Sequence, residues 1–414
     1  MNASAKTRVL LLTQWFDPEP TFKGLVFARE LVRQGFEVEV VTGFPNYPGG
    51  KVYPGYKIRW IQRERIDGVE VTRLPLYANH DQSAIKRVLN YVSFAASALF
   101  YGLFMAKRAD VMYAYHPPLT VGVAASLIRL VRGIPLVYDI QDMWPDTLRA
   151  SGMLNNPRAL SLVGSVCDWV YRRVDQVVVL SPGFKRLLVQ RGVPESKIEV
   201  VYNWADESAL MTPTGTLSTN FPGDERFKIV FAGNMGKAQA LDAVLQAAEI
   251  LQGRGSRVCF VMLGGGVEVG RLKERKNELA LDNVVFLPAV PMAEVGTVLS
   301  AADALFVHLR KDPLFEITIP SKTQAYMAVG RPLLMAVNGD TADLVTQCNS
   351  GLTAESENPL ALADAAQRLA DMPLDQLQAM GRRARQFYQE RLSLAVGAGR
   401  FGEIFKVLAS RAKG

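Results

Sequence analysis

Cationic side chains and one carboxylate gather between residues 304 and 324 of the chain. The apolar run Ala304–Val307 predicts a buried strand, and Pro320 before Ser321 predicts that a helix begins there. Ser321 and Gln324 have capping-box spacing, which places Lys322 in the first turn of that helix. Positive charges beside a helix start would stabilise a leaving diphosphate, although a solvated charged loop has the same composition. The candidate residues in this segment are His308, Arg310, Lys311, Glu316, Pro320, Ser321, Lys322 and Gln324.

A glycine-rich turn follows another apolar run. Lys228–Ala232 leads into Gly233-Asn234-Met235-Gly236-Lys237, and a helical pattern starts at about Leu241. Such a turn exposes backbone N–H groups at the positive end of a helix dipole, where a diphosphate binds, and Lys237 adds a charge. Glycines also form ordinary tight turns, so the pattern alone leaves both interpretations open. A further glycine run, Gly264–Gly266, does not have the spacing of a dinucleotide-binding fingerprint.

One histidine in the N-terminal half stands where functional residues of parallel sheets are found. His116 directly follows the apolar run Val111–Tyr115. Ligands of such sheets bind beyond the carboxyl ends of the strands. His116 is therefore a candidate for orienting a substrate, with a structural role in a helix-starting turn as the alternative.

Apolar runs alternate with helix-period segments in two series, which is the pattern of repeated βαβ units. A stretch rich in Pro, Thr, Ser and Gly, Met211–Gly223, separates the series. The predicted strands are Val9–Leu12, Val38–Thr42, Val69–Leu74, Val111–Tyr115, Leu136–Ile140 and Gln176–Leu180, and then Lys228–Ala232, Val258–Leu263, Val284–Phe286, Ala304–Val307 and Leu333–Ala336. We therefore expect two doubly wound, Rossmann-like α/β domains that face a central cleft, with a boundary near residues 205 to 225.

Composition restricts the class of protein. A chain of 414 residues with 49% hydrophobic residues is long enough for two domains. The net charge of +7 suits an anionic ligand or membrane surface but is too diffuse to indicate nucleic acid. Three widely separated cysteines predict neither a zinc site nor a disulfide framework. The short apolar run near the N-terminus is not a secretory signal, so we expect a cytoplasmic protein.

Nineteen uncharged residues, Val88–Ala106, raise the question of a membrane span. A span would cut the predicted N-terminal sheet in two. Polar residues at helical spacing, namely Lys86, Asn90, Ser93 and Ser97, instead predict an amphipathic helix over about 83–107 that lies in the membrane interface. We expect its lipid-facing side chains to be Tyr91, Phe94, Leu99, Phe100, Tyr101 and Phe104, flanked by Lys86, Arg87, Lys107 and Arg108. The alternative is a helix packed in the core.

The chain resembles retaining GT-B glycosyltransferases of family 4. The resemblance spans nearly all of it and is strongest toward the branch that adds an acetamido sugar, such as N-acetyl-fucosamine, in bacterial capsule, O-antigen and colanic-acid-type synthesis. In the C-terminal half it rests on Ile319-Pro-Ser-Lys-x-x-x-Tyr-Met-Ala-x-Gly-x-Pro332, Phe231-Ala-Gly-Asn-Met-Gly-Lys237 and Met380-Gly-Arg-Arg-Ala-Arg. In the N-terminal half it rests on Pro18-Glu19-Pro20 with Gly24, Asn46-Tyr47-Pro48, His116-Pro117-Pro118 and Asp142-Met143-Trp144-Pro145-Asp146.

Three positions depart from the family pattern. Many members have two glutamates in this segment, and here Glu316 stands for the first while Ala325 occupies the place of the second, which contacts the nucleotide ribose. Asn234 follows Gly233 where an arginine is common, and Gln141 replaces a histidine before Asp142.

The resemblance implies a metal-independent, cofactor-free transfer with retention from a UDP-sugar to a polyprenyl-diphosphate-linked saccharide, on the inner face of the cell membrane. Residues 1–205 would bind the acceptor, with 396–414 completing that domain, and residues 206–395 would bind the donor. Lys237, Arg310 and Lys322 would stabilise the diphosphate, Glu316 would bind donor-sugar hydroxyls, and Asp142 or His116 would orient acceptor or sugar. The donor-binding set would be Gly24, Gly233, Asn234, Lys237, Gly265, Gly266, Pro320, Ser321 and Gln324.

Two other functions are compatible with the sequence. A UDP-sugar 2-epimerase on the same scaffold would form product without an acceptor lipid. A catalytically silent nucleotide-sugar-binding protein would account for Ala325 in the place of the ribose glutamate.

Overall fold

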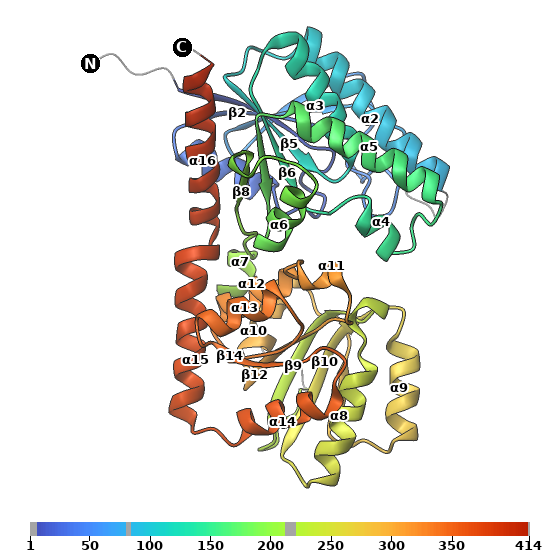
Figure 1. Ribbon diagram of the computed structural model, residues 1–414, viewed down its shortest axis with the longest axis vertical. Coiled ribbons are helices and arrows are strands. Elements are labelled where there is room, and N and C mark those ends of the chain that lie inside the picture. The colour runs from blue at the N-terminus through green and yellow to red at the C-terminus, as the bar shows by residue number, and fades with distance from the viewer. Residues whose placement is uncertain (1–5, 80–83, 212–220, 413–414) are drawn as a thin grey trace, which may run out of the picture. The chain divides into compact units, whose positions relative to one another are not determined.

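The computed structural model describes residues 6–79, 84–211 and 221–412. The chain forms two compact units, each built around one β-sheet (Figure 1). Unit 1 consists of Met1–Tyr202 together with Gly397–Gly414, and unit 2 consists of Asn203–Val396. The chain therefore passes between the units twice.

Unit 1 contains an eight-stranded sheet in the order β3-β4-β2-β1-β5-β6-β7-β8, parallel except for the antiparallel edge strand β3. Its strands are β1 Arg8–Leu12, β2 Glu37–Gly43, β3 Gln62–Ile66, β4 Val69–Leu74, β5 Val111–His116, β6 Leu136–Ile140, β7 Gln176–Val179 and β8 Ile198–Val200. Its helices before the first crossing are α1 Leu25–Arg33, α2 Ala84–Phe104, α3 Leu119–Arg132, α4 Asp146–Ala150, α5 Pro157–Arg173 and α6 Pro182–Gln190. Helices α2, α3 and α5 form a layer on one side of the sheet (Figure 1).

Unit 2 contains a six-stranded parallel sheet in the order β11-β10-β9-β12-β13-β14. Its strands are β9 Phe227–Asn234, β10 Val258–Gly265, β11 Val284–Leu287, β12 Ala304–His308, β13 Leu333–Ala336 and β14 Gly351–Ala354. Its helices are α7 Glu207–Met211, α8 Asp242–Gly253, α9 Val269–Glu278, α10 Met292–Ser300, α11 Pro313–Glu316, α12 Ser321–Val329, α13 Asp340–Gln347, α14 Pro359–Ala370 and α15 Leu374–Phe387. Buried side chains of α8 and α14 pack against β9, β10 and β12 to form the core.

The predicted fold class is confirmed, because each unit is an α/β layer structure around a parallel sheet. All eleven predicted strands are present. The sequence analysis missed three strands, β3, β8 and β14, and each of them lies at an edge of its sheet. Residues 212–220 of the predicted separating stretch lie outside the described residues.

The last helix, α16 Leu394–Arg411, returns the chain to unit 1. The ring of Phe401 lies 5.2 Å from that of Phe27 and 5.5 Å from that of Tyr113, measured between centroids. Gly402 lies so close to Phe36 that a Cβ there would be 3.1 Å from the ring. The C-terminal helix therefore covers part of the core of unit 1.

Helix α2 exists, and Asn90 and Ser97 of its polar stripe bond into unit 1, whereas Lys86 of the same stripe is exposed. Asn90 is fully buried and donates to the carbonyl oxygen of Tyr77 at 2.8 Å. Ser97 donates to the carbonyl oxygen of Pro75 at 2.8 Å. The predicted first residue of this helix, Ser83, lies outside the described residues. Across the part of the chain that is described, no helix is both long and apolar enough to cross a bilayer.

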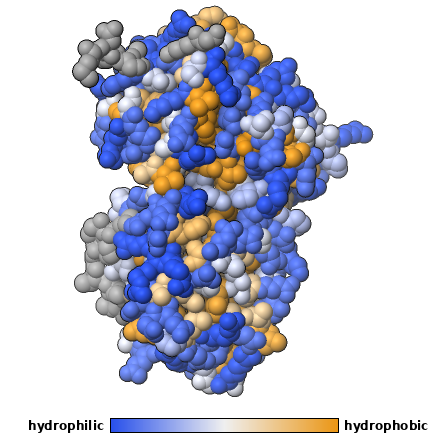
Figure 2. Space-filling model, turned by 60° about the vertical axis from the view of Figure 1, so that its left-hand side comes forward, coloured by the Kyte–Doolittle hydropathy of each residue, from blue (hydrophilic) through white to orange (hydrophobic). Residues whose placement is uncertain are grey.

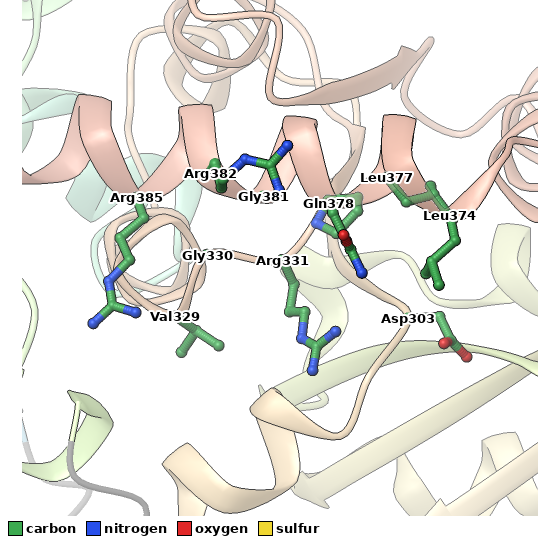
Figure 3. A pocket seen from close by; sticks show the side chains of 11 residues that line it. Asp303, Val329, Gly330, Arg331, Leu374, Leu377, Gln378, Gly381, Arg382 and Arg385 are labelled. Atoms are coloured by element: carbon green, nitrogen blue, oxygen red, sulfur yellow. The ribbon is translucent and has the colours of Figure 1, made fainter.

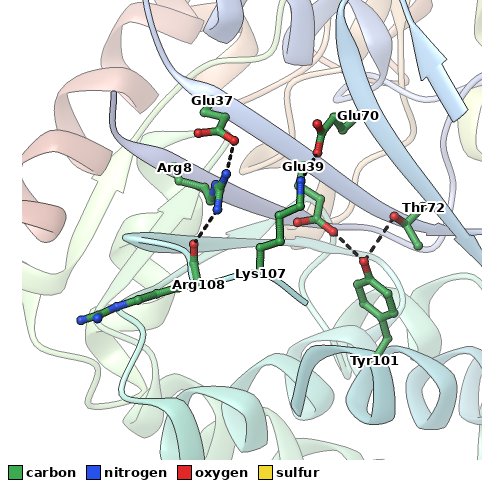
Figure 4. Close-up of polar contacts among 8 residues, drawn as sticks. All are labelled: Arg8, Glu37, Glu39, Glu70, Thr72, Tyr101, Lys107 and Arg108. Atoms are coloured by element: carbon green, nitrogen blue, oxygen red, sulfur yellow. Dashed lines mark hydrogen bonds and ion pairs between the residues drawn. The ribbon is translucent and has the colours of Figure 1, made fainter. Parts of the chain in front are cut away.

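Two of the aromatic residues predicted to face lipid are in the core instead. Phe94 is fully buried, and Tyr101 donates from its hydroxyl to Glu39 at 2.7 Å (Figure 4). Lys107 pairs with Glu70 at 3.0 Å, whereas the side chain of Arg108 extends away from this network (Figure 4). Tyr91 and Leu99 are only partly buried.

The outward side of α2 is apolar. Its exposed residues include Ile85, Val88, Leu89, Val92, Phe100 and Phe104, with Phe104 73% exposed. The surface drawn in Figure 2, by contrast, is mostly hydrophilic, and its apolar side chains form small patches. A series of large apolar side chains along one exposed helix is typical of an interaction surface.

The two segments that join the units are held together by one tyrosine. Tyr388 is 1% exposed, donates to Glu207 Oε1 at 2.8 Å and accepts from the backbone N–H of Ala205 at 3.1 Å. Glu207 also accepts from the N–H of Leu394 at 2.9 Å. Residues just after the first crossing are thereby bonded to residues just before the second.

We predict that Tyr388→Phe lowers the free energy of unfolding by about 1–3 kcal/mol, because the buried N–H of Ala205 loses its acceptor. Urea unfolding followed by circular dichroism measures the effect. Tyr77→Phe, at a 44% exposed side chain, is the control and should change the value by less than about 0.5 kcal/mol. Equal unfolding curves for Tyr388→Phe and the wild type would contradict the prediction.

Candidate functional site

The predicted donor residues of unit 2 gather at the carboxyl edge of its sheet. Strands β10, β9, β12 and β13 are neighbours in the sheet, so the loops that follow them lie next to one another. In doubly wound sheets this edge is where ligands bind. The residues brought to it are Gly233, Asn234, Lys237, Gly265, Gly266, Arg310, Glu316, Pro320, Ser321, Lys322 and Gln324.

Two glycine turns press against each other at this edge. A Cβ on Gly264 would lie 2.1 Å from the carbonyl oxygen of Gly233, and one on Gly266 would lie 2.4 Å from that of Met235. Both glycines have positive φ, 137° and 142°. The N–H of Met235 donates to the carbonyl oxygen of Gly265 at 2.7 Å. The close approach of the two backbones therefore explains why positions 264 and 266 are glycines, whereas Gly265 borders open space.

Lys322 lies in the first turn of α12, and its Nζ atom is buried although the residue as a whole is only partly buried. Its Nζ has no hydrogen-bond partner among the described residues and lies 3.7 Å from the centroid of the Phe231 ring. A Cβ on Gly233 would lie 3.6 Å from this Nζ, so the ammonium group adjoins the glycine turn after β9. Burial lowers the pKa of Lys322 to about 7. An anionic oxygen at this point would stabilise the charged form of the lysine.

The predicted capping box at the start of α12 is wrong. The N-cap is Pro320 and not Ser321, and it makes no side-chain cap hydrogen bond. With its amide in the orientation that the neighbouring carbonyls require, Gln324 donates to Pro320 at 2.8 Å and to Ser321 at 3.2 Å. Gln324 is 1% exposed, while Ser321 is exposed. The helix start is thus held by a buried amide, which leaves the hydroxyl of Ser321 at the surface.

Arg310 lies on the loop after β12. Its guanidinium pairs with Asp312 at 3.0 Å and stacks on the ring of Phe315, 5.4 Å from the centroid. The N–H of Arg310 donates to the carbonyl oxygen of Ala238 at 2.9 Å, which joins this loop to the turn that carries the exposed Lys237.

Glu316 ends the short helix α11, and its backbone is tightly packed. A Cβ on Gly339, which has a φ of 73°, would lie 2.0 Å from the carbonyl oxygen of Glu316. The loop before α13 therefore fixes the position of Glu316. Ala325, in place of the ribose glutamate, is partly buried in α12.

His308 is a structural residue and not one of the ligand-facing cations. Its Nδ1 lies 2.6 Å from the carbonyl oxygen of Gln239, and its Nε2 accepts from the N–H of Glu357 at 3.2 Å. Both ring nitrogens are therefore used in the neutral form, with the proton on Nδ1. Burial lowers the pKa of His308, which agrees with a neutral ring.

The predicted residues of unit 1 lie at the carboxyl edge of its own sheet. His116 ends β5, is 2% exposed and has a buried Nδ1 with no hydrogen-bond partner among the described residues. Burial lowers its pKa to about 3, so the ring is neutral at physiological pH. Asp142 follows β6, and burial raises its pKa. Both residues stay candidates for orienting a substrate.

The local packing explains why position 24 is a glycine. It is the N-cap of α1, and a Cβ there would lie 2.2 Å from the carboxylate of Asp17. That carboxylate accepts from the N–H of Leu25 at 2.6 Å. The first turn of α1 is thus bonded to an acidic side chain of the protein itself, which disfavours an anion at the same place.

The sequence analysis missed a buried charge pair beneath this edge. Lys23 and Asp139 are buried, and their charged atoms lie 4.0 Å apart. Tyr113 donates to the carboxylate of Asp139 at 2.6 Å, and Gln141 donates at 2.5 Å. Burial lowers the pKa of Lys23 to about 8. The available signal was the aspartate inside the apolar run Leu136–Ile140.

A cavity of about 250 Å³ lies at the opposite edge of the unit 2 sheet (Figure 3). Its lining comes from the residues before β12 and β13, including Asp303 and Arg331, and from Arg382 and Arg385 of α15. Because ligands bind at the carboxyl edge of such sheets, we place the candidate site at Gly233 and Lys322 and not in this cavity. Within the described ranges, no cluster of three or more His, Cys, Asp or Glu side chains could hold a metal ion.

Two α/β units with largely parallel sheets are the architecture of the GT-B class of fold, and comparisons with known proteins assign the chain to it. The family described as glycosyl transferase 4-like domain matches residues 25–204, and the family described as glycosyl transferases group 1 matches residues 218–387. The chain belongs to the GT-B glycosyltransferases of family 4 that these two domains define.

Two curated bacterial relatives carry the name of a glycosyltransferase, and one of them is named for colanic acid biosynthesis. WcaI of Escherichia coli K12, assigned to colanic acid biosynthesis, is 27% identical over 72% of this chain and 75% of its own. WbjE of Pseudomonas aeruginosa, described as a probable glycosyltransferase, is 24% identical over 70% of this chain and 73% of its own.

Solved structures share the fold at low sequence identity. HepE of Anabaena, in complex with UDP, has a TM-score of 0.68 at 15% identity and covers 97% of this chain and 100% of its own. Sucrose-phosphate synthase of Thermosynechococcus elongatus has a TM-score of 0.72 at 16% identity, and the match covers 98% of this chain and 100% of its own.

We predict that Lys322→Met stabilises the protein at pH 6 by more than about 1 kcal/mol, since each unit by which burial lowers a pKa corresponds to about 1.4 kcal/mol. At pH 6 both folded and unfolded lysine are charged, and only the folded one is desolvated. Above pH 7 the folded lysine loses its proton, while the unfolded one, with an ordinary pKa of 10.5, keeps it. The free energy of unfolding of the wild type therefore rises with pH, and the advantage of Lys322→Met over the wild type becomes smaller.

Urea unfolding between pH 6 and pH 10 checks this prediction. The exposed Lys273 of α9 provides the matched control, because Lys273→Met should leave stability unchanged at every pH. A difference between Lys322→Met and the wild type that stays constant with pH would contradict it.

Proposed function

We propose that this protein transfers an acetamido sugar from a nucleoside diphosphate donor, UDP in the simplest case, to a lipid-linked saccharide of a bacterial surface polysaccharide. The observation that carries the proposal is the buried ammonium group of Lys322, which has no hydrogen-bond partner among the described residues and adjoins the turn at Gly233. A diphosphate supplies the oxygens that such a group binds. The complex of HepE with UDP-glucose supports this choice of donor by analogy of fold.

In the proposed reaction the bond between the anomeric carbon and the diphosphate oxygen breaks, and the acceptor oxygen bonds to the same face of the sugar. The departing diphosphate takes the proton of the acceptor hydroxyl. Lys322 and Arg310, with Lys237 at the rim, stabilise the charge that develops on the diphosphate. Glu316 accepts hydrogen bonds from hydroxyls of the donor sugar, while neutral His116 and Asp142 orient the sugar or the acceptor.

The outward side of α2 supports a lipid-linked acceptor and association with the inner face of the cell membrane. Phe100 and Phe104 are 45% and 73% exposed, and their ring centroids lie 5.2 Å apart. Asn90 and Ser97 bond to the protein interior, and the exposed side of the helix is largely apolar, which suits contact with acyl chains. The polysaccharide role of WcaI agrees with an acceptor of this kind.

We predict that Lys322→Ala and Arg310→Ala each lower turnover by about a hundredfold or more, the effect of removing one charge-stabilising donor. Initial rates of sugar transfer from labelled UDP-sugars to lipid in a bacterial membrane extract measure this. Lys273→Ala controls for the loss of a surface charge on unit 2. Wild-type turnover in both variants would refute the assigned roles.

The same assay separates the three functions that the sequence leaves open. A labelled lipid product supports transfer. A soluble isomer of the UDP-sugar formed without extract would support a 2-epimerase instead, and binding without any product would support a silent nucleotide-sugar-binding protein.

We predict that replacing Phe100 and Phe104 with serine lowers binding to vesicles of phosphatidylglycerol and phosphatidylethanolamine by about tenfold or more, because each buried aromatic side chain contributes about 1.5–3 kcal/mol. Vesicle sedimentation measures the bound fraction. Leu374→Ser, at a 69% exposed leucine of unit 2, is the control. Wild-type protein that never sediments with vesicles would remove the membrane from the proposal.

A further inference from the structure

Aromatic and amide side chains form a second cluster at the carboxyl edge of the unit 1 sheet. They come from the loops after the neighbouring strands β1 and β2 and from the inward side of α2. We call them the aromatic–amide cluster, and its members are Gln14, Trp15, Asn46, Tyr47, Asn90 and Tyr91.

Two other rings of this cluster pack against Trp15. The centroid of Trp15 lies 4.7 Å from that of Tyr47, with an angle of 32° between the rings, and 6.4 Å from that of Tyr91, with an angle of 73°. All three side chains are partly exposed. Aromatic surface with a few directed polar groups is the usual lining of a small-molecule site.

The amides form a buried chain. Asn90 accepts from Gln14 Nε2 at 2.5 Å and donates to Asn46 Oδ1 at 3.3 Å. Gln14 and Asn90 are fully buried, and Asn46 is 1% exposed. The positions of the polar atoms in this chain are therefore fixed by the fold.

Two buried atoms of the cluster have no partner among the described residues, and they differ in kind. Gln14 Oε1 is an acceptor, and Trp15 Nε1 is a donor. A phosphate oxygen would satisfy the indole N–H but could not donate to the amide oxygen. A sugar hydroxyl or an acetamido group both donates and accepts, so an uncharged sugar carries both kinds of partner that these atoms lack.

The position of the cluster on α2 distinguishes an acceptor sugar from a donor sugar. Asn90 and Tyr91 belong to the cluster, whereas Val88, Leu89 and Val92 in the same turns are 57%, 50% and 50% exposed. A sugar attached to a lipid on the outward side of α2 is only the thickness of one helix from the cluster. A donor sugar has no such link to this helix.

We propose that the aromatic–amide cluster is the acceptor subsite, in which Trp15 Nε1 and Gln14 Oε1 bind a hydroxyl or acetamido group of a neutral sugar ring. This assignment rests on the proposed function for its lipid-linked acceptor. Trp15 is then a residue that determines acceptor specificity and takes no part in binding the diphosphate.

The first test observes the indole N–H directly and needs no catalytic activity. In protein labelled with ¹⁵N-tryptophan, the five tryptophans give five indole signals, and Trp15→Phe identifies one of them by its disappearance. The probes are the methyl glycosides of N-acetylglucosamine, N-acetylgalactosamine, glucose, galactose and fucose, with inorganic diphosphate as the charged comparison. We expect the Trp15 signal to shift saturably with at least one glycoside and not with diphosphate.

The signal of Trp169, on α5, is the internal control and should not move. A Trp15 signal unchanged by every glycoside up to about 100 mM, well beyond a millimolar Kd, would overturn the proposal. A shift caused by diphosphate alone would also overturn it, because the cluster would then be an anion site.

The second test uses transfer kinetics with the membrane-extract acceptor. Trp15→Phe keeps an aromatic ring but removes the N–H, and we expect the KM for acceptor to rise about tenfold, the effect of one lost hydrogen bond to a buried group. The KM for UDP-sugar and the rate at saturating acceptor should stay unchanged. Trp169→Phe is the matched control.

The two tests separate failure of this inference from failure of the proposed function. Active wild-type enzyme with an equal acceptor KM in Trp15→Phe overturns the acceptor subsite alone. Wild-type enzyme that transfers no sugar to lipid overturns the proposed function, while the indole signal still reports whether the cluster binds a sugar.

Discussion

The ammonium group of Lys322 is the constraint on which the candidate site depends. An amine that is buried without a hydrogen-bond acceptor destabilises the folded chain, so the surrounding structure has to hold it in place. The tight approach of Gly233 and Gly264, the buried amide of Gln324 and the ring of Phe231 do so. The site is thus prepared for negative charge at a cost to stability, which is a common property of preorganised enzyme sites.

Unit 1 is organised differently around its own sheet edge. Its buried lysine Lys23 is paired with Asp139, and a carboxylate of the protein bonds to the start of α1. In the described part of unit 1, the buried side-chain atoms that lack hydrogen-bond partners belong to neutral side chains, such as Gln14, Trp15 and His116. The chemistry of the two edges therefore favours an anion in unit 2 and an uncharged polar ligand in unit 1.

The sequence predicted the parts of the fold that are buried on all sides. Central strands such as β5 are apolar runs, but the edge strand β3, Gln-Arg-Glu-Arg-Ile, alternates charged residues that face solvent, so periodicity did not reveal it. Phe94 and Tyr101 of α2 were predicted to face lipid but are buried in unit 1, because composition cannot show which apolar residues of a helix meet the core. Lys322 was identified, whereas the cluster around Trp15 depends on contacts between distant segments.

Because α16 packs on unit 1, the core of unit 1 is completed only when the last helix of the chain has been synthesised. During synthesis, Phe27 and Tyr113 emerge from the ribosome long before Phe401, which packs against both of them. Unit 2 is therefore complete, or nearly so, while unit 1 still exposes apolar surface that only the last helix covers. Such a nascent chain has an extended period in which it is open to chaperones and to aggregation, and a product that ends early leaves its first domain unfinished.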